Sequence, residues 1–109
     1  MKKFLVLYHS PVSAREQMAN ATPEQAKAGM DAWMAWAGRA GSSIVDMGAP
    51  VGDPIIVGNG KASAGHIGGY GVVQASSERD AKKLFEGHPH LMMPGASIEL
   101  LELLSMPGM

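Results

Sequence analysis

Apolar positions along the chain fall into short runs separated by polar and glycine-rich stretches. Residues 4–8 are apolar at consecutive positions, which is typical of a strand that is buried on both faces. Apolar runs at 44–47, 68–75 and 97–104 predict three further strands. The leucine-rich last run would also suit a helix, but its short length and the Pro-Gly pair before it favour a strand.

Two other segments carry apolar side chains at helical spacing. The first covers 22–40. Thr22 can cap its start, Pro23 suits the first helical position and Gln25 completes a capping box. Its apolar face is expected to consist of Ala26, Met30, Trp33, Ala37 and Ala40. The second helix is predicted at 78–86, with a serine before it as a cap and a glycine after it as a stop.

The remaining stretches are expected to be connections. Residues 10–21 are mostly polar, and 48–54 is a loop rich in glycine and proline. Beyond that loop, 55–57 and 62–64 flank an Asn-Gly pair at 59–60, which is a good signal for a tight turn. These two runs therefore predict a small hairpin between the second and third main strands.

The resulting order of elements is β-α-β, a hairpin, and then β-α-β. It predicts an α+β protein with a ferredoxin-like split βαβ fold and an antiparallel sheet, in one domain spanning 1–109. Two helices cover only one face of such a sheet, yet 4–7 and 100–104 are apolar on both faces, where a sheet with one exposed face should alternate. The sequence therefore predicts a homodimer in which the same face of a second copy covers the other side and closes a barrel.

Composition narrows the classes of function. The formal charge of −1, without a basic block, argues against nucleic-acid binding. The chain has no cysteine, which excludes disulfides, thiolate nucleophiles and cysteine-ligated zinc, and is compatible with a reducing compartment. The N-terminal Met-Lys-Lys imitates the start of a signal peptide, but the apolar run after it is too short, and no run is long enough to span a membrane. We therefore expect a cytoplasmic protein without a membrane partner.

The second half of the chain carries motifs that are typical of one known family. They are Gly68-Gly69-Tyr70, the segment Ala-Ser-Ser-Glu-Arg-Asp-Ala at 75–81, His88-Pro89-His90-Leu91, and the segment Pro-Gly-Ala-Ser-Ile-Glu at 94–99. With the first strand, the first helix and the Gly-Ala-Pro turn at 48–50, they resemble the YCII-related proteins. The resemblance covers most of the chain, and it implies a dimeric α/β barrel that usually works without a cofactor. It also implies a candidate catalytic pair of histidine and aspartate, which is proposed for some members.

The chain departs from this family pattern at the catalytic pair. Those members carry the histidine on the first helix, where this chain has Met30 or Asp31. The aspartate of the family falls near Asp53. The Asp-Gly-Pro-Phe motif of another branch is replaced by Ala-Gly-His-Ile at 64–67. The histidine–aspartate pair therefore does not carry over whole to this chain.

The predicted topology places all four histidines at the same end of the sheet. His9 follows the first strand, His66 precedes the third, and His88 and His90 follow the second helix. Asp53 leaves the second strand at this end as well. We therefore expect a pocket at this end, between the helices and the sheet.

Histidine is suited to acid/base chemistry near neutral pH, which gives this pocket a candidate activity. His90 is the favoured catalytic residue, because Pro89 stiffens the backbone before it and an apolar residue follows it. Asp53 or Asp31 could orient the imidazole. The catalytic candidates are His90, Asp53 and His66, and the substrate-binding candidates are His9, His88, Asp31 and Met93.

Other interpretations of the histidines stay open. Histidines in loops are often simply solvated, or they cap the carbonyl groups at the end of a helix. His88, His90 and His66 could also supply three nitrogen ligands to a metal, but their spacing is nonspecific, and we expect neither a metal site nor a cofactor.

Two functions of different classes follow from these residues. The first is a cofactor-free enzyme that transfers protons in a lyase-like or isomerase-like reaction on a small cyclic or aromatic molecule. The second is a non-catalytic module for ligand binding or oligomerisation.

Overall fold

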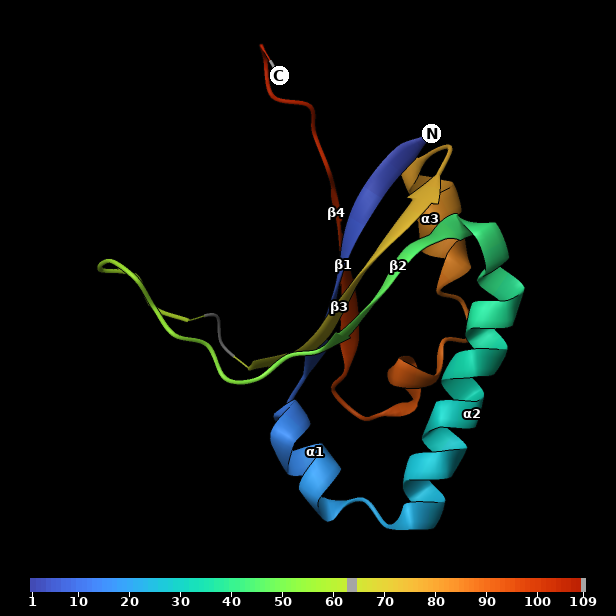
Figure 1. Ribbon diagram of the computed structural model, residues 1–109, viewed down its shortest axis with the longest axis vertical. Coiled ribbons are helices and arrows are strands. Elements are labelled where there is room, and N and C mark those ends of the chain that lie inside the picture. Colours follow the sequence, from blue (N-terminus) through green and yellow to red (C-terminus); the bar gives the residue numbers. More distant parts are fainter. Residues whose placement is uncertain (63–64, 109) are drawn as a thin grey trace.

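The computed structural model describes residues 1–62 and 65–108 (Figure 1). Its main elements, in chain order, are β1 (Lys2–Ser10), α1 (Ala14–Asn20), α2 (Pro23–Ala40), β2 (Ile44–Pro50), β3 (His66–Ala75), α3 (Glu78–Leu84) and β4 (Ser97–Glu102). Two short 3-10 turns, η1 (Gly41–Ser43) and η2 (Pro89–Met92), follow α2 and α3. The four main strands and the two helices predicted from the sequence, which correspond to α2 and α3, are thus confirmed.

The four strands form one antiparallel sheet in the order β2-β3-β1-β4. Because each strand runs antiparallel to its neighbours, β1 and β2 are parallel with β3 between them, and β3 and β4 are parallel with β1 between them. The chain therefore folds as two interlocked βαβ-like units in an α+β domain. Figure 1 shows α2 and α3 on the same side of this sheet.

The core lies between the sheet and these two helices. Alternate side chains of β1, among them Phe4, Val6 and Tyr8, are buried there, as a strand with one covered face requires. Trp36 of α2 is buried against them, and its indole N–H donates a hydrogen bond of 2.7 Å to the carbonyl oxygen of Leu84. This bond ties α2 to the end of α3 and satisfies a polar group that burial would otherwise leave unpaired.

The start of α2 agrees with the predicted capping box. The Thr22 hydroxyl accepts from the backbone N–H of Gln25, and the Gln25 side chain accepts from the backbone N–H of Thr22. The predicted apolar face of the helix is only half right. Ala40 is buried and Trp33 and Ala37 are partly buried, but Ala26 and Met30 are exposed. The N-terminal half of α2 extends beyond the sheet, so that the apolar side chains of this half do not pack on the sheet (Figure 1).

Two predicted connections differ from the structure. Residues 10–21 were expected to be irregular, but they contain α1, whose Ser13 cap accepts from the backbone N–H of Glu16. The hairpin predicted at 55–57 and 62–64 is wrong in its described part, because 51–62 contains no strand; residues 63 and 64 lie outside the described residues. An Asn-Gly turn forms a hairpin only when the flanking runs pair, and here they do not.

The start of the predicted loop at 48–54 is also different, because 48–50 belongs to β2. Gly48 has a φ of 72°, and a side chain at this position would collide with the carbonyl oxygen of Tyr70 on β3. Only glycine permits both this backbone angle and so close an approach. The register of β2 on β3 shifts between Ile44 and Asp46 and again between Asp46 and Ala49, the interval that contains Gly48.

The face of the sheet that no helix covers is called the open face below. Strand alternation and register assign to it Lys3, Leu5, Leu7, His9, Tyr70, Val72, Gln74, Glu99 and Leu101. Most of these side chains are apolar, as the sequence predicted for a sheet with a second buried face. Among the residues that the structure describes, none of the helices has both the length and the apolar character needed to cross a bilayer.

Candidate functional site

The four histidines do gather at one end of the sheet, as predicted. His9 lies near the end of β1, and His66 begins β3 opposite Ser10. His88 and His90 follow α3, and the His90 ring reaches the backbone of His9. They lie, however, on two sides of the sheet: His88 and His90 among the helices, and His9 on the open face.

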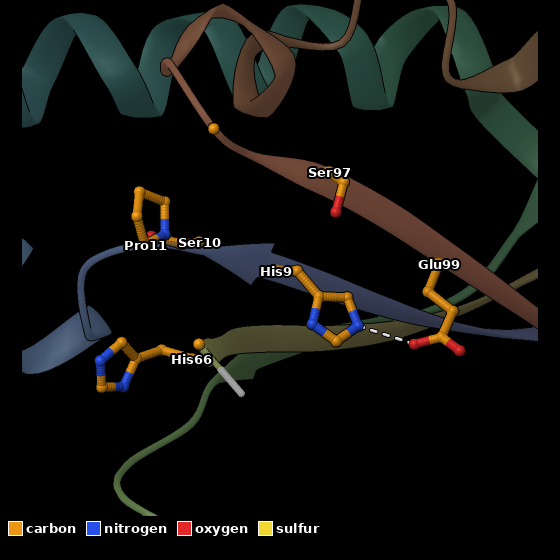
Figure 2. A pocket seen from close by; sticks show the side chains of 8 residues that line it. His9, Ser10, Pro11, His66, Ser97 and Glu99 are labelled. Carbon is orange, nitrogen blue, oxygen red and sulfur yellow. Dashed lines mark hydrogen bonds and ion pairs between the residues drawn. The ribbon is translucent and has the colours of Figure 1, made fainter. Parts of the chain in front are cut away.

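A pocket of about 470 Å³ opens on the side of His9 (Figure 2). Its lining consists of His9, Ser10, Pro11, Gly65, His66, Gly95, Ser97 and Glu99. Figure 2 shows the rings of His9 and His66 at separate places in this pocket, with the Glu99 carboxylate beside His9. The pocket is therefore built from the ends of three neighbouring strands, which hold its side chains on rigid backbone.

The polar centre of this pocket is an imidazole–carboxylate pair. His9 Nε2 lies 2.7 Å from Glu99 Oε1, a distance typical of a strong hydrogen bond with one charged partner. A carboxylate only accepts, so that Nε2 carries a hydrogen, and in the neutral ring Nδ1 then presents its lone pair. A histidine oriented in this way can take a proton from a bound molecule, and the carboxylate stabilises the imidazolium that results.

Sequence reasoning missed Glu99 as a partner for His9. The two residues are 90 positions apart, and they meet because β4 pairs with β1, with Leu7 opposite Glu99 and His9 opposite Ser97. Alternation alone puts Glu99 on one face of a strand, but it does not say which strand lies beside it. The strand order predicted from the fold was the one signal that could have found this pair.

His90, the favoured catalytic residue, is engaged with the backbone. Its Nε2 donates to the carbonyl oxygen of His9 at 2.8 Å, and its own backbone N–H donates to His88 Nδ1 at 3.0 Å. The ring lies against Tyr8, with centroids 5.3 Å apart. His90 thus connects η2 to the end of β1 and holds the backbone of His9 from the helix side.

His88 is fully buried in a box of aromatic rings. Its ring centroid lies 4.5 Å from those of Trp33 and of Trp36, and Tyr8 and Phe85 complete the box. Burial, together with smaller electrostatic contributions from His90 and Arg39, lowers the pKa of His88 from 6.5 to about 4. His88 is therefore neutral at physiological pH.

The hydrogen bonds of His88 are only half satisfied. Nδ1 accepts from the backbone of His90, so that the hydrogen of the neutral ring sits on Nε2. Among the described residues, no hydrogen-bond partner meets this buried Nε2. The surrounding aromatic rings offer at most a weak N–H···π contact. Burial in the same box raises the pKa of Tyr8 above its ordinary value.

The two aspartates proposed from the sequence lie away from His9. Asp53 is exposed, with Oδ2 3.9 Å from Arg15 Nε, and it lines a second pocket of about 420 Å³ that His66 also borders. Asp31 is exposed on α2, where it pairs with Lys27 Nζ at 3.1 Å, and it lines neither pocket. The structure therefore brings Asp53 near His66, and it brings Asp31 near none of the histidines.

Met93 lies just behind the first pocket. Its sulfur accepts from the Gln17 side chain at 3.0 Å and from the Ser10 hydroxyl at 3.5 Å. Ser10 is buried, and its hydroxyl also bonds to the backbone of Val12. This cluster fixes the turn from β1 into α1, and so it supports the wall of the pocket at Ser10.

The described part of the chain, 1–62 and 65–108, contains no cluster of three histidine or carboxylate side chains that could hold a metal ion. Comparison of the chain with family models, with curated proteins and with solved structures found no match.

Proposed function

We propose that this chain is a cofactor-free enzyme that transfers protons on a small cyclic or aromatic molecule, with His9 as the base. The observation that carries this proposal is the 2.7 Å pair of His9 and Glu99 at a pocket of about 470 Å³. A pocket of that size accommodates a small organic molecule. His66, on the same pocket, is a second group that could donate or accept a proton.

The reaction class that suits this pair is proton abstraction next to a carbonyl group. His9 Nδ1 takes the proton from carbon, and the electron pair moves onto the carbonyl oxygen to give an enolate. Glu99 holds the imidazole and stabilises its positive charge. Return of the proton to another atom completes an isomerisation, and loss of a neighbouring group completes an elimination. In this proposal His90 is a positioning residue, since its ring is bonded to the backbone of His9.

The test follows exchange of carbon-bound hydrogen for deuterium. A panel of cyclic ketones and lactones in deuterated buffer is monitored by proton NMR with and without the protein. For a molecule that is processed, His9→Gln should lower the exchange rate by about 10²–10⁴-fold. Glu99→Gln should lower this rate as well, because the amide cannot stabilise the imidazolium. Glu102→Gln is the matched control, since Glu102 lies on the same strand but pairs with Lys2.

If the wild type and His9→Gln accelerate deuterium exchange equally, His9 is not the base. Retained exchange in His9→Gln but lost exchange in His66→Gln would transfer the role to His66. Equal losses in Glu99→Gln and Glu102→Gln would show an effect on the strand rather than on the pair.

A second candidate function is a non-catalytic module for ligand binding or oligomerisation. It is favoured by the position of His9 and Glu99 on neighbouring strands, where a pair of opposite polarity stabilises a sheet by itself. In that case Glu99→Gln would lower stability slightly, and no molecule of the panel would exchange faster in the presence of the protein.

For the fold, we propose the ferredoxin-like, dimeric α/β barrel that the YCII-related motifs imply. The strand order β2-β3-β1-β4 with helices on one face supports the ferredoxin-like assignment. The apolar side chains of the open face support a homodimer in which two such faces pack together. The lack of cysteine agrees with a cytoplasmic location for this dimer.

A further inference from the structure

Residues 51–62, called the projecting arm below, extend far from the sheet. Figure 1 shows the arm on the side of the sheet opposite α2 and α3, which is the side of the open face. Val51 still donates to the carbonyl oxygen of Gly68, but among the described residues no backbone hydrogen bond joins 52–62 to the body of the domain. Side-chain contacts hold only the base of the arm, where Asp53 Oδ2 lies 3.9 Å from Arg15 Nε.

The side chains of the arm are unusually exposed for apolar residues. Ile55 and Val57 are 90% and 96% exposed. The same holds for residues 103–108, called the C-terminal tail below, where Leu104 and Met106 are 78% and 66% exposed. Exposed apolar segments of this kind mark surfaces that are covered in the working protein.

The overall dimensions agree with an incomplete unit. The radius of gyration is 15.0 Å. A compact domain of this length has a radius of gyration of about 13 Å. Figure 1 shows that the arm and the tail extend from the body at opposite ends of the sheet. The arm leaves at the end that holds His66, whereas Leu103 of the tail bonds to Lys3 at the other end.

The open face supplies part of the surface that a stable dimer needs. Four strands of 6 to 10 residues are involved. At about 4.8 Å between strands and about 3.3 Å per residue, they span a projected area of roughly 400–600 Å², to which the relief of the side chains adds. A standard interface buries about 800 Å² of accessible surface on each partner. The arm and the tail carry further apolar surface that two copies meeting at this face would bury.

Charge favours one orientation of the second copy. Lys3 lies at one end of the open face and Glu99 at the other. A two-fold axis that lies in the interface and runs perpendicular to the strands places the Lys3 ends of the two copies at opposite ends of the dimer, so that these like charges stay apart. An axis parallel to the strands would instead place Lys3 opposite Lys3. The first arrangement also brings the arm of each copy to the tail of the other.

We propose that the projecting arm clasps a second copy of this chain, with Ile55 and Val57 packed against the C-terminal tail of the partner at Leu104 and Met106. This inference rests on the dimer of the proposed function and adds the segments that hold it together. The base of the arm, at 51–54 and 56, also lines the second pocket, the one that contains Asp53. The clasp therefore fixes a wall of this second pocket from the partner subunit.

The test uses the absence of cysteine in the chain. In the double variant Val57→Cys/Leu104→Cys, a short bismaleimide linker should join two chains into a covalent dimer on a denaturing gel. Each single variant should stay largely monomeric on that gel, because the two-fold axis keeps identical positions apart. Val57→Cys/Met30→Cys is the matched control, since Met30 is also exposed but lies on α2, on the helix side.

Equal cross-linking of the test pair and the control pair would overturn the clasp, and so would a product linked within one chain. Sedimentation of the unlinked protein separates the two levels of the proposal. If the protein sediments as a dimer but the test pair does not cross-link, the clasp alone is refuted. If the protein sediments as a monomer at micromolar concentration, the dimer is refuted as well. Neither outcome affects the deuterium exchange assay for His9.

A second measurement does not depend on cross-linking. Ile55→Ser/Val57→Ser should raise the Kd of the dimer at least tenfold and leave the fold intact, because both side chains are exposed in one chain. Met30→Ser/Met34→Ser, which removes two exposed apolar side chains from α2, should leave this Kd unchanged. An unchanged Kd in the arm variant would refute the clasp.

Discussion

Two pairs of histidines lie at the same end of one sheet, and they differ in almost every physical property. On the helix side, His88 is fully buried among aromatic rings and His90 is bonded to the backbone. On the other side, His9 and His66 line an open pocket, and His9 has a carboxylate partner. The comparison teaches that burial, and not residue type or position at the end of the sheet, separates a structural histidine from one available for chemistry.

The largest expected effect is the loss of stability when a histidine on the helix side, rather than one on the open face, is replaced by alanine. His88→Ala should lower the free energy of unfolding by about 3–4 kcal/mol, because it opens a cavity among the aromatic rings and leaves the backbone N–H of His90 without its acceptor. His9→Ala should cost less than about 1 kcal/mol, as an exposed polar pair does. Urea denaturation measures both. Similar losses in the two variants would break the comparison.

The pH dependence of the unfolding free energy should show that His88 is buried. The pKa of His88 is about 4 in the folded protein and near its ordinary value of 6.5 in the unfolded chain. Between these values the unfolded chain binds the proton and the folded protein does not, so that stability falls as the pH is lowered from about 6.5 to about 4. The loss should reach about 3 kcal/mol.

The control for this pH dependence is His88→Phe, which keeps an aromatic ring in the box but has no group to protonate. The difference in unfolding free energy between the wild type and this variant should shrink steadily from pH 7 to pH 4. A difference that stays constant over this range would mean that His88 is not the group responsible.

His90 connects the two sides and should show an intermediate effect. His90→Leu removes the donor to the carbonyl oxygen of His9 and should cost about 1 kcal/mol. If the strand end shifts as a result, the deuterium exchange that depends on His9 should fall by about tenfold. His90→Gln, whose amide can still donate, should restore much of this rate. Full loss of exchange in His90→Gln would instead make His90 a base, as the sequence suggested.

The smallest effect is expected at Glu99. Glu99→Gln should change the unfolding free energy by less than about 1 kcal/mol, because half of this carboxylate is solvated and salt screens it. The small change in stability beside a large change in exchange rate would sharpen the contrast with His88. Thermal melts at low and high salt measure the first quantity, and a loss well above 1 kcal/mol would mark the pair as structural.

Local sequence determined the elements of this protein. The capping box of Thr22 and Gln25 forms as predicted, and Ser77 caps α3 through the backbone N–H of Asp80. The four strands lie where apolar runs predicted them. These features depend on side chains a few positions apart, so that propensity and spacing are enough to find them. The gathering of the histidines at one end needed the fold topology in addition, because it depends on the order of the strands.

Tertiary structure alone decided the rest. Glu99 meets His9 only through the register of β4 on β1. Met30 is exposed because the sheet ends before the first turns of α2, whereas His88 is buried. Residues 55–57, the described run before the Asn-Gly pair at 59–60, form no strand, because a strand needs a partner that pairs with it. Register and burial are set by contacts between residues far apart in the chain, and a local sequence pattern does not predict these contacts.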